Sequence, residues 1–268
     1  MLQFAQFGPE DEQNSSPPAE EVPAPRLVSP ALYAPTEKAV PAFEMKFLLA
    51  EEVARAVEER VRGVLALDPH AAENGGTYQT TSLYCDTPQF DVFHRTGVGR
   101  RRKHRLRRYG REPQIFLERK SKKGQRVRKR RTVITEPELP LLTHPLSLVN
   151  WQGYWFHRRL LARQLQPVCR VSYERTAYMG PSPDGPIRLT FDRNLRGCLE
   201  SAWRLEPVTD GPTLYPGEVV CEFKFRNALP PLFKGIITDL RLTPGGASKY
   251  RRYLGSLQDF PGRPAVSP

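Results

Sequence analysis

Apolar and polar residues alternate along several short segments of the chain, and each such segment predicts a β-strand. Successive side chains of a strand point to opposite faces, so residues two apart share a face. The predicted strands are 42–49, 78–86, 99–109, 114–121, 125–135, 168–179, 187–195 and 218–226. Most are joined as antiparallel hairpins. This order favours an α+β fold, an eight-stranded antiparallel β-barrel with helices packed outside it.

Apolar residues at helical spacing predict the helices. Residues 51–67 carry an apolar stripe, acids in the first turn and a stop at Asp68-Pro69. Residues 139–166 contain Pro145, which predicts two helices in this stretch. Further helices are expected at 230–242 and 248–257.

The two ends of the chain differ in composition from the rest. Residues 1–40 are rich in Pro, Glu, Ser and Ala without a period, which predicts a disordered acidic tail. Residues 259–268 contain three prolines and predict a short second tail. The folded unit is therefore expected to span residues 41–258 as one domain.

The charges on the predicted strands share faces. Glu-x-Lys occurs three times, at Glu44–Lys46, Glu118–Lys120 and Glu222–Lys224. Further same-face sets are Lys103 with Arg105 and Arg107, Arg126 with Arg128 and Arg130, and Arg188 with Asp192. Charged faces of strands usually face water. However, the opposite faces are apolar, and if the helices cover them, the charged faces line the barrel. From the residues alone both arrangements stay open.

The charge balance points to a polyanionic or phosphate-rich ligand. The 268 residues hold 41 Lys and Arg against 29 Asp and Glu, a formal net charge of +12, although residues 1–40 carry a net charge of −4. The four cysteines and five histidines lack zinc-site spacing, and the cysteines indicate no disulfide framework. Neither a membrane span, a secretory signal nor a Walker A loop is recognisable. A soluble cytoplasmic protein is the expectation.

Several motifs in this order resemble a known family. They include FEMKFLL, YQTTSLYCDTP, RRRKHRLRRYG, FLERKS, RVRKRR, VCRVSYERTAY, IRLTFDRNLR, CEFKFR and ASKYRRYL, over about residues 42–257. The chain resembles the VTC-type polyphosphate polymerase domain of the CYTH, or triphosphate tunnel metalloenzyme, superfamily. The resemblance implies a basic tunnel that binds ATP or another triphosphate and, with Mn²⁺ or Mg²⁺, transfers the γ-phosphate to a growing polyphosphate chain.

The resemblance also implies roles for individual residues. Those assigned to catalysis, as the phosphate-binding wall, are Lys46, Arg105, Arg107, Lys120, Arg188 and Lys249. Those assigned to substrate binding, where neighbouring bases make the alignment ambiguous, are Lys103, Lys129, Arg170, Arg175, Lys224 and Ser248. The expected metal ligands are Glu222, Glu44 and Glu118. Apart from the resemblance, Asp86 is expected to be structural and to hold the turn before Pro88, and Asp192 is expected to pair with Arg188 or Arg193 rather than to bind metal.

Three other functions compete with polymerisation. A triphosphatase or a non-catalytic polyphosphate-binding module would use the same basic wall. Residues 100–131 hold 17 bases, which also suits nucleic acid, but only Tyr109 and Phe116 are interleaved for base stacking, so nucleic acid is disfavoured. A membrane-associated partner is compatible with the basic charge. The oligomeric state is not indicated.

Overall fold

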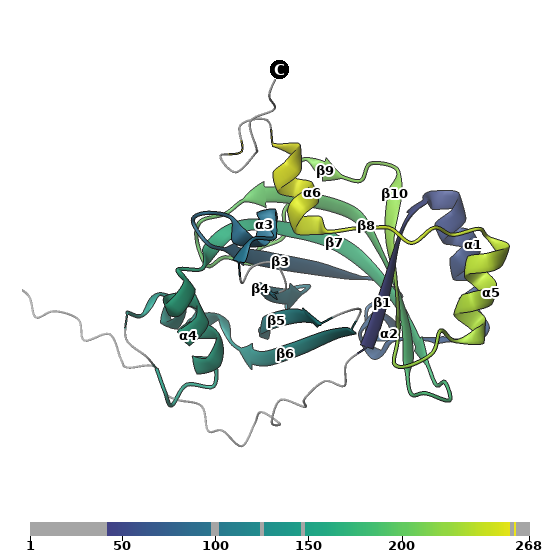
Figure 1. Cartoon of the computed structure of the whole chain (residues 1–268), viewed down its shortest axis with the longest axis horizontal. Coiled ribbons are helices and arrows are strands. Elements are labelled where there is room, and N and C mark those ends of the chain that lie inside the picture. Colours follow the sequence, from purple (N-terminus) through teal and green to yellow (C-terminus); the bar gives the residue numbers. More distant parts are fainter. Residues whose placement is uncertain (1–41, 98–101, 124–125, 146–147, 258–259, 261–268) are drawn as a thin grey trace, which may run out of the picture.

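The computed structural model describes residues 42–97, 102–123, 126–145, 148–257 and 260 (Figure 1). The predicted tail at 1–40 lies outside the described residues. So does the predicted tail at 259–268, apart from Phe260. Among the described helices, none is long and apolar enough to cross a membrane.

Eight antiparallel strands close into a barrel, which confirms the predicted fold class. They are β1 (Ala42–Ala50), β3 (Tyr78–Asp86), β4 (Arg102–Tyr109), β5 (Ile115–Lys123), β6 (Arg126–Ile134), β7 (Gln166–Gly180), β8 (Ile187–Leu199) and β10 (Glu218–Phe225). Their order is β7-β3-β4-β5-β6-β1-β10-β8, and β8 pairs with β7 to complete the circle. Two short strands, β2 (Ala66–Leu67) and β9 (Thr213–Leu214), extend β7 and β8 outside it.

The helices predicted from the sequence are present, but several differ from the predictions in length. They are α1 (Glu51–Arg62), α2 (Pro69–Glu73), α3 (Asp91–His94), the 3₁₀ helix η3 (Glu136–Thr143), α4 (Tyr154–Arg163), α5 (Pro231–Asp239) and α6 (Lys249–Ser256). The prediction of one helix over 51–67 was wrong at its end, because Ala66 and Leu67 pair with β7 instead. The first of the two helices predicted in 139–166 is the 3₁₀ helix, and it begins earlier.

Helices cover the apolar outer face of the barrel on two sides (Figure 1). Next to α1 and α5, the ring centroids of Phe47 of β1 and Phe223 of β10 lie 4.9 Å apart with the rings tilted, and the Phe223 centroid lies 4.5 Å from that of Phe233 of α5. All three are fully buried, which stabilises the fold by about 2–3 kcal/mol each. Next to α4, Leu106 and Phe156 belong to a second buried cluster. Because both outer walls are apolar, the alternating charged residues face inward.

The barrel is paired least between β1 and β6. Among the described residues, backbone pairing there joins Ala42 with Val127 and Phe43 with Arg126. Farther along β1, the segment 243–248 hydrogen-bonds to the strand: the Gly245 amide donates to the Lys46 carbonyl at 2.7 Å. This segment leads into α6, whose Tyr250 packs with Tyr84 of β3. The sequence before α6 thus places its first residues at the interior of the barrel.

Candidate functional site

Basic side chains from seven of the eight barrel strands and from α6 face the interior. They are Lys46 of β1; Lys103, Arg105 and Arg107 of β4; Lys120 of β5; Lys129 and Arg131 of β6; Arg175 of β7; Arg188 of β8; Lys224 of β10; and Lys249 of α6. The acids among them are Glu44, Glu118, Asp192 and Glu222. Bases therefore outnumber acids, and the interior carries a surplus of positive charge.

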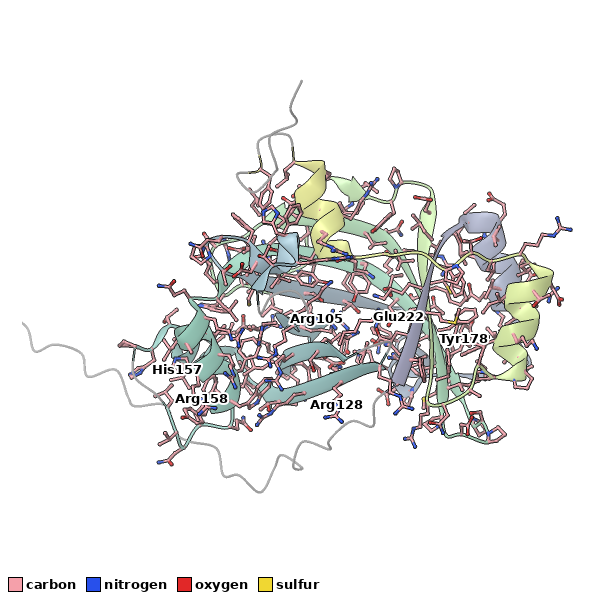
Figure 2. The ribbon with its side chains drawn as sticks, viewed as in Figure 1. Arg105, Arg128, His157, Arg158, Tyr178 and Glu222 are labelled. Carbon is pink, nitrogen blue, oxygen red and sulfur yellow. The ribbon has the colours of Figure 1, made fainter. Side chains whose placement is uncertain are left out.

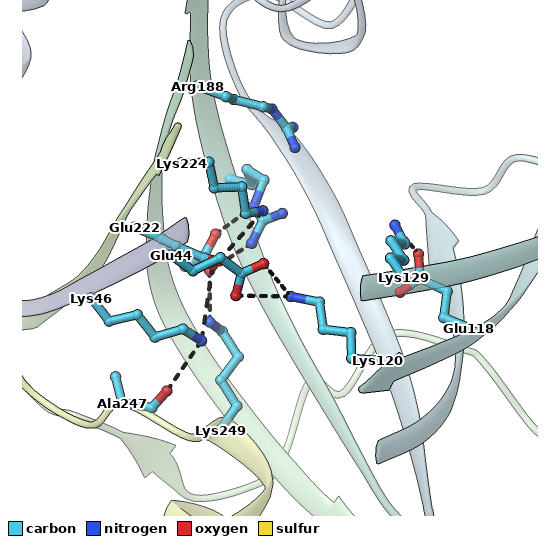
Figure 3. A network of polar contacts seen from close by, with 12 residues as sticks. Glu44, Lys46, Glu118, Lys120, Lys129, Arg188, Glu222, Lys224, Ala247 and Lys249 are labelled. Carbon is cyan, nitrogen blue, oxygen red and sulfur yellow. Dashed lines mark hydrogen bonds and ion pairs between the residues drawn. The ribbon is translucent and has the colours of Figure 1, made fainter. Parts of the chain in front are cut away.

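The inner faces of β1 and β10 carry alternating charges (Figure 3). In this register Glu44 lies opposite Lys224, and Lys46 lies opposite Glu222. Lys46 Nζ is 3.9 Å from Glu222 Oε2, and Lys224 Nζ is 3.4 Å from Glu222 Oε1. Lys120 reaches across from β5 and donates to Glu44 Oε1 at 3.0 Å. Two of the three Glu-x-Lys segments thus form one network.

Glu222 is an anion held in the middle of this network. Burial alone would raise its pKa, but the ammonium groups of Lys224 and Lys46 outweigh burial and hold the pKa well below its usual range. Within the described residues, its Oε1 atom is buried and accepts no hydrogen bond. That oxygen therefore has the ion pair with Lys224 but no hydrogen bond, so it can still accept one.

Glu118 has a different environment from Glu44 and Glu222. Its side chain is 0% exposed, and it accepts from Arg105 Nε at 2.8 Å and Arg131 Nε at 2.9 Å, with Lys129 Nζ 2.5 Å away. Burial opposes its ionisation, but Arg105 and Lys129 hold its pKa well below the usual range. Both of its oxygens are engaged by bases, so it fixes the positions of three cations.

Asp192 plays the same part on the opposite side of the barrel. Arg175 donates to its two oxygens at 2.6 and 2.8 Å, and Lys249 Nζ donates to Oδ2 at 2.6 Å. Lys249 also lies 4.6 Å from the ring centroid of Tyr173. The predicted pairing of Asp192 with Arg188 or Arg193 was therefore wrong. Arg188 instead contacts Asp68 and Tyr78, and Arg193 contacts Glu51 and Glu58.

Arg107 and Lys103 have no acidic partner within the described residues. Arg107 donates to Ser82 Oγ at 3.1 Å and to the Tyr173 hydroxyl at 2.7 Å. Lys103 donates to Ser248 Oγ at 3.1 Å. Burial, and then the charges of Lys46 and Lys120, lower the pKa of Lys103 to about 7. Burial likewise lowers the pKa of Lys224 to about 8. Burial is the main cause of both shifts, and a bound anion would oppose it and raise both pKa values.

Comparison with known proteins places the chain in a family. A family model described as VTC domain matches residues 42–257. The chain belongs to the VTC domain family. No curated protein matches the chain.

Solved structures with similarly arranged strands share little sequence with this VTC domain. A candidate adenylate cyclase from Bacillus halodurans has 13% identity and a TM-score of 0.49, covering 79% of this chain and 95% of its own. A candidate adenylyl cyclase from Hippeastrum, described as having a dominant triphosphatase activity, has 15% identity, a TM-score of 0.44 and coverages of 82% and 99%. The PH1819 protein from Pyrococcus horikoshii has 12% identity, a TM-score of 0.43 and coverages of 81% and 99%.

The wall of the VTC domain differs from the expected one at two strands. Arg170 lies on the outer face of β7, where its guanidinium contacts Glu200 at 3.1 Å and Glu206, so it is not part of the interior. On β6, the set Arg126, Arg128 and Arg130 faces outward, while Lys129 and Arg131 face inward. The sequence analysis did not assign Arg131 to the interior, because both faces of β6 carry basic residues and alternation does not distinguish them.

Two further residues singled out in the sequence, Ser248 and Asp86, lie next to the interior wall. Ser248 caps the N-terminus of α6 and contacts Lys103, so it lies at the interior as expected. Asp86 is structural, as expected, because it accepts from the amides of Thr87, Val92 and Phe93 and from the Tyr250 hydroxyl. Asp86 thereby anchors α3 and α6 to β3 and helps to position Lys249.

Among the described acids of the VTC domain, Glu222 and Glu44 suit a divalent metal best. Among the described residues, no group of three or more His, Cys, Asp or Glu is arranged to hold a metal ion. Mg²⁺, however, is often bound by one or two carboxylates together with substrate phosphates and water. Glu222, with its buried oxygen that accepts no hydrogen bond, and Glu44 on the neighbouring strand, which accepts from the single base Lys120, suit that pattern. Glu118 does not suit it, because three bases engage its two oxygens.

Proposed function

We propose that this VTC domain is a metal-dependent polyphosphate polymerase that transfers the γ-phosphoryl group of ATP to the end of a polyphosphate chain inside the barrel. The observation that carries the proposal is the interior wall, in which bases from seven strands and α6 converge with few acids among them. Such a wall is costly unless a polyanion or water fills it. Membership of the VTC domain family supports the proposal.

The wall suits phosphoryl transfer because this reaction needs positioning and charge stabilisation more than a protein nucleophile. The bond from the γ-phosphorus to the β–γ bridging oxygen breaks, and a new bond forms to a terminal oxygen of the chain, with ADP leaving. Arg107, steadied by Ser82 and Tyr173, offers a fixed guanidinium to the phosphate oxygens. Lys46, Lys103 and Lys224 supply compact positive charge.

A bound Mn²⁺ or Mg²⁺ would neutralise charge on the phosphate oxygens. Glu222 and Glu44 are the residues that would hold it. Glu118 and Asp192 each hold two or three of the bases in ion pairs. The interior is therefore organised before substrate enters, as electrostatic stabilisation of a transition state requires.

Transfer to phosphate suits this wall better than hydrolysis. A chain end is already ionised near neutral pH and needs no base, whereas an attacking water must lose a proton. The surrounding bases lower the pKa of Glu118 and Glu222, so these carboxylates are weak bases. Lys103, with a pKa of about 7, is the observation that favours a triphosphatase. Bound phosphate would raise that pKa and protonate Lys103, which removes it as a base.

The test uses purified protein with ATP and Mn²⁺ or Mg²⁺, with and without a short polyphosphate primer. Products are separated on a gel stained for polyphosphate, and free phosphate is assayed in parallel. Glu222→Gln should abolish the chains, while Glu52→Gln on the exposed face of α1 should leave them unchanged. Free phosphate without chains would replace the polymerase with a triphosphatase. Tight polyphosphate binding without either product would make the protein a binding module.

A further inference from the structure

A second group of bases lies outside the barrel, between the outer face of β4–β6 and α4. We call it the outer arginine cluster. Its members are Arg102, Arg119 and Arg130 on the strands and Arg158, Arg159 and Arg163 on α4. Figure 2 shows Arg158 on α4, well separated from Arg105 and Glu222 in the barrel. The proposed reaction does not use any of the six.

The register of the strands brings several of these charges together. Arg119 of β5 lies directly opposite Arg130 of β6 on one side and His104 of β4 on the other. Burial lowers the pKa of Arg119, and Arg102, Arg130, Arg159 and Arg163 lower it further. Like charges directly opposite each other on a sheet are destabilising. The fold therefore holds positive charges together at a cost.

No carboxylate compensates this charge within the part of the chain that the structure describes. None of the six arginines forms an ion pair or a side-chain hydrogen bond there. The Nε atom of Arg119 is buried and without a hydrogen-bond partner. Beneath it, His104 is buried and neutral, since burial and the charges of Arg119 and Arg163 lower its pKa to about 3. The cluster thus has donors that no described acceptor satisfies.

Aromatic rings hold the guanidinium groups instead. The Arg130 guanidinium lies 4.4 Å from the centroid of the Trp155 ring, and that of Arg119 lies 5.8 Å from it. Trp155 is itself fixed, because its Nε1 donates to Thr132 Oγ1 at 2.7 Å. Arg158 lies 5.6 Å from the Tyr154 ring in the same way. Stacked arginines keep their N–H groups available in the plane of the guanidinium, where phosphate oxygens accept.

We propose that the outer arginine cluster is a second binding site for polyphosphate, which holds a length of chain outside the barrel. This proposal rests on the proposed function, since it takes the same polymer as its ligand. The two sites adjoin at the start of β4, where Arg102 belongs to the outer cluster and its neighbour Lys103 to the interior wall. A chain that passes over this rim can contact both.

The same observations disfavour other polyanions. Single-stranded nucleic acid needs free aromatic faces for its bases. Here Trp155 is only 8% exposed and has arginines against its ring. An anionic membrane is best met by fully exposed bases. By contrast, Arg102, Arg119, Arg159 and Arg163 are half-buried between sheet and helix. A narrow, flexible phosphate chain fits this position.

The test compares affinities for long-chain polyphosphate and for tripolyphosphate, supplied from outside, so that it does not depend on catalysis. The variant is Arg130→Gln with Arg158→Gln, both exposed. The matched control removes the same charge elsewhere, as Arg111→Gln with Lys234→Gln. The cluster variant should bind the long chain at least tenfold more weakly, and the control at most twofold. Both should bind tripolyphosphate like the unmodified protein, because that ligand is held by the interior.

The outcomes separate the two proposals. Equal affinity of the cluster and control variants for the long chain would overturn the second site, even if the protein makes polyphosphate. Loss of tripolyphosphate binding in the cluster variant would also overturn it, because the cluster would then only shape the interior. If the variant instead loses binding to vesicles with anionic lipid or to single-stranded DNA, while long-chain binding is unchanged, the cluster serves a membrane or a nucleic acid.

Discussion

Lys103 has no acidic partner among the described residues of the barrel, and it would make the proposed phosphate binding depend on pH in a calculable way. Burial and neighbouring lysines lower its pKa to about 7, and its hydrogen bond to Ser248 does not supply negative charge. A phosphate chain in the barrel would raise this pKa towards or above its ordinary value. Binding must then be accompanied by uptake of a proton, and affinity must fall as the pH rises above 7.

The size of the effect follows from the pKa. At pH 8, a group with a pKa of about 7 is about 90% neutral, so its protonation on binding takes up about 0.9 proton. If the bound pKa is about 9.5 or higher, affinity falls about fivefold between pH 7 and pH 8 and about sevenfold between pH 8 and pH 9 from Lys103 alone. Lys224, with its pKa of about 8, adds a smaller dependence of the same sign.

Calorimetry can count these protons. Long-chain polyphosphate is titrated at pH 8 in two buffers of different ionisation enthalpy, and the difference in heat gives the number of protons taken up. Long chains are suitable because their internal phosphates stay ionised throughout this range. Lys103→Met should lower the uptake by about 0.9 proton. Lys234→Met, a change at an exposed position of α5, should leave it unchanged.

Two results would refute this reasoning. The first is binding without proton uptake, which would mean that the interior lysines are already charged or do not meet the phosphates. The second is equal uptake by Lys103→Met and the unmodified protein, which would assign the protons to other groups. The first result would contradict the proposed binding mode, and the second would remove Lys103 from it and leave the uptake to other groups such as Lys224.

Three further predictions concern the fixed parts of the wall. Glu118→Gln should lower the free energy of unfolding by about 3–5 kcal/mol in urea titrations, because three cations lose their buried partner. Since the folded pKa of Glu118 lies below the unfolded value of 4.5, its contribution is present above that pH and lost as the pH falls, so the variant should show a shallower acid dependence. Asp86→Ala should cost about 2–4 kcal/mol in the same titrations, since three amides and the Tyr250 hydroxyl lose their acceptor; no loss would contradict its anchoring role. Arg107→Lys should lower kcat/KM about 100-fold, since Lys cannot contact Ser82, Tyr173 and a phosphate together; an equal activity in steady-state assays would remove Arg107 from the wall.

Much of the barrel could be predicted because apolar and charged residues alternate strictly along those strands that have one apolar face. On β1 and β10, phenylalanines alternate with Glu-x-Lys, and the helices cover the phenylalanines, so the charges face inward. The same logic fails on β6, where Arg126 to Arg131 is basic at five of six positions and both faces look alike. There, only the pairing with β5 decides which set meets Glu118.

Two other predictions about the site were wrong for different reasons. One overlooked the alternation of side chains along a strand, and the other concerned contacts between residues far apart in the sequence. Arg170 and Arg175 are five positions apart on one strand, so alternation places their side chains on opposite faces. The prediction that both bind substrate in the interior could therefore have been rejected from the sequence. The ion-pair partners of Asp192 could not be predicted from alternation along one strand. Arg175 lies 17 positions away and Lys249 57 positions away, and they meet it only because β7 pairs with β8 and α6 enters the barrel.

The most direct test of the central claim follows the γ-phosphoryl group itself. Protein is mixed with ATP labelled at the γ-phosphate, Mn²⁺ and a short polyphosphate primer, and the label is measured over time in chains and in free phosphate. The proposed transfer predicts that label enters the primer, lengthens it stepwise and exceeds the label in free phosphate from the first time points. Label that appears only as free phosphate, at a rate unaffected by the primer, would contradict the account.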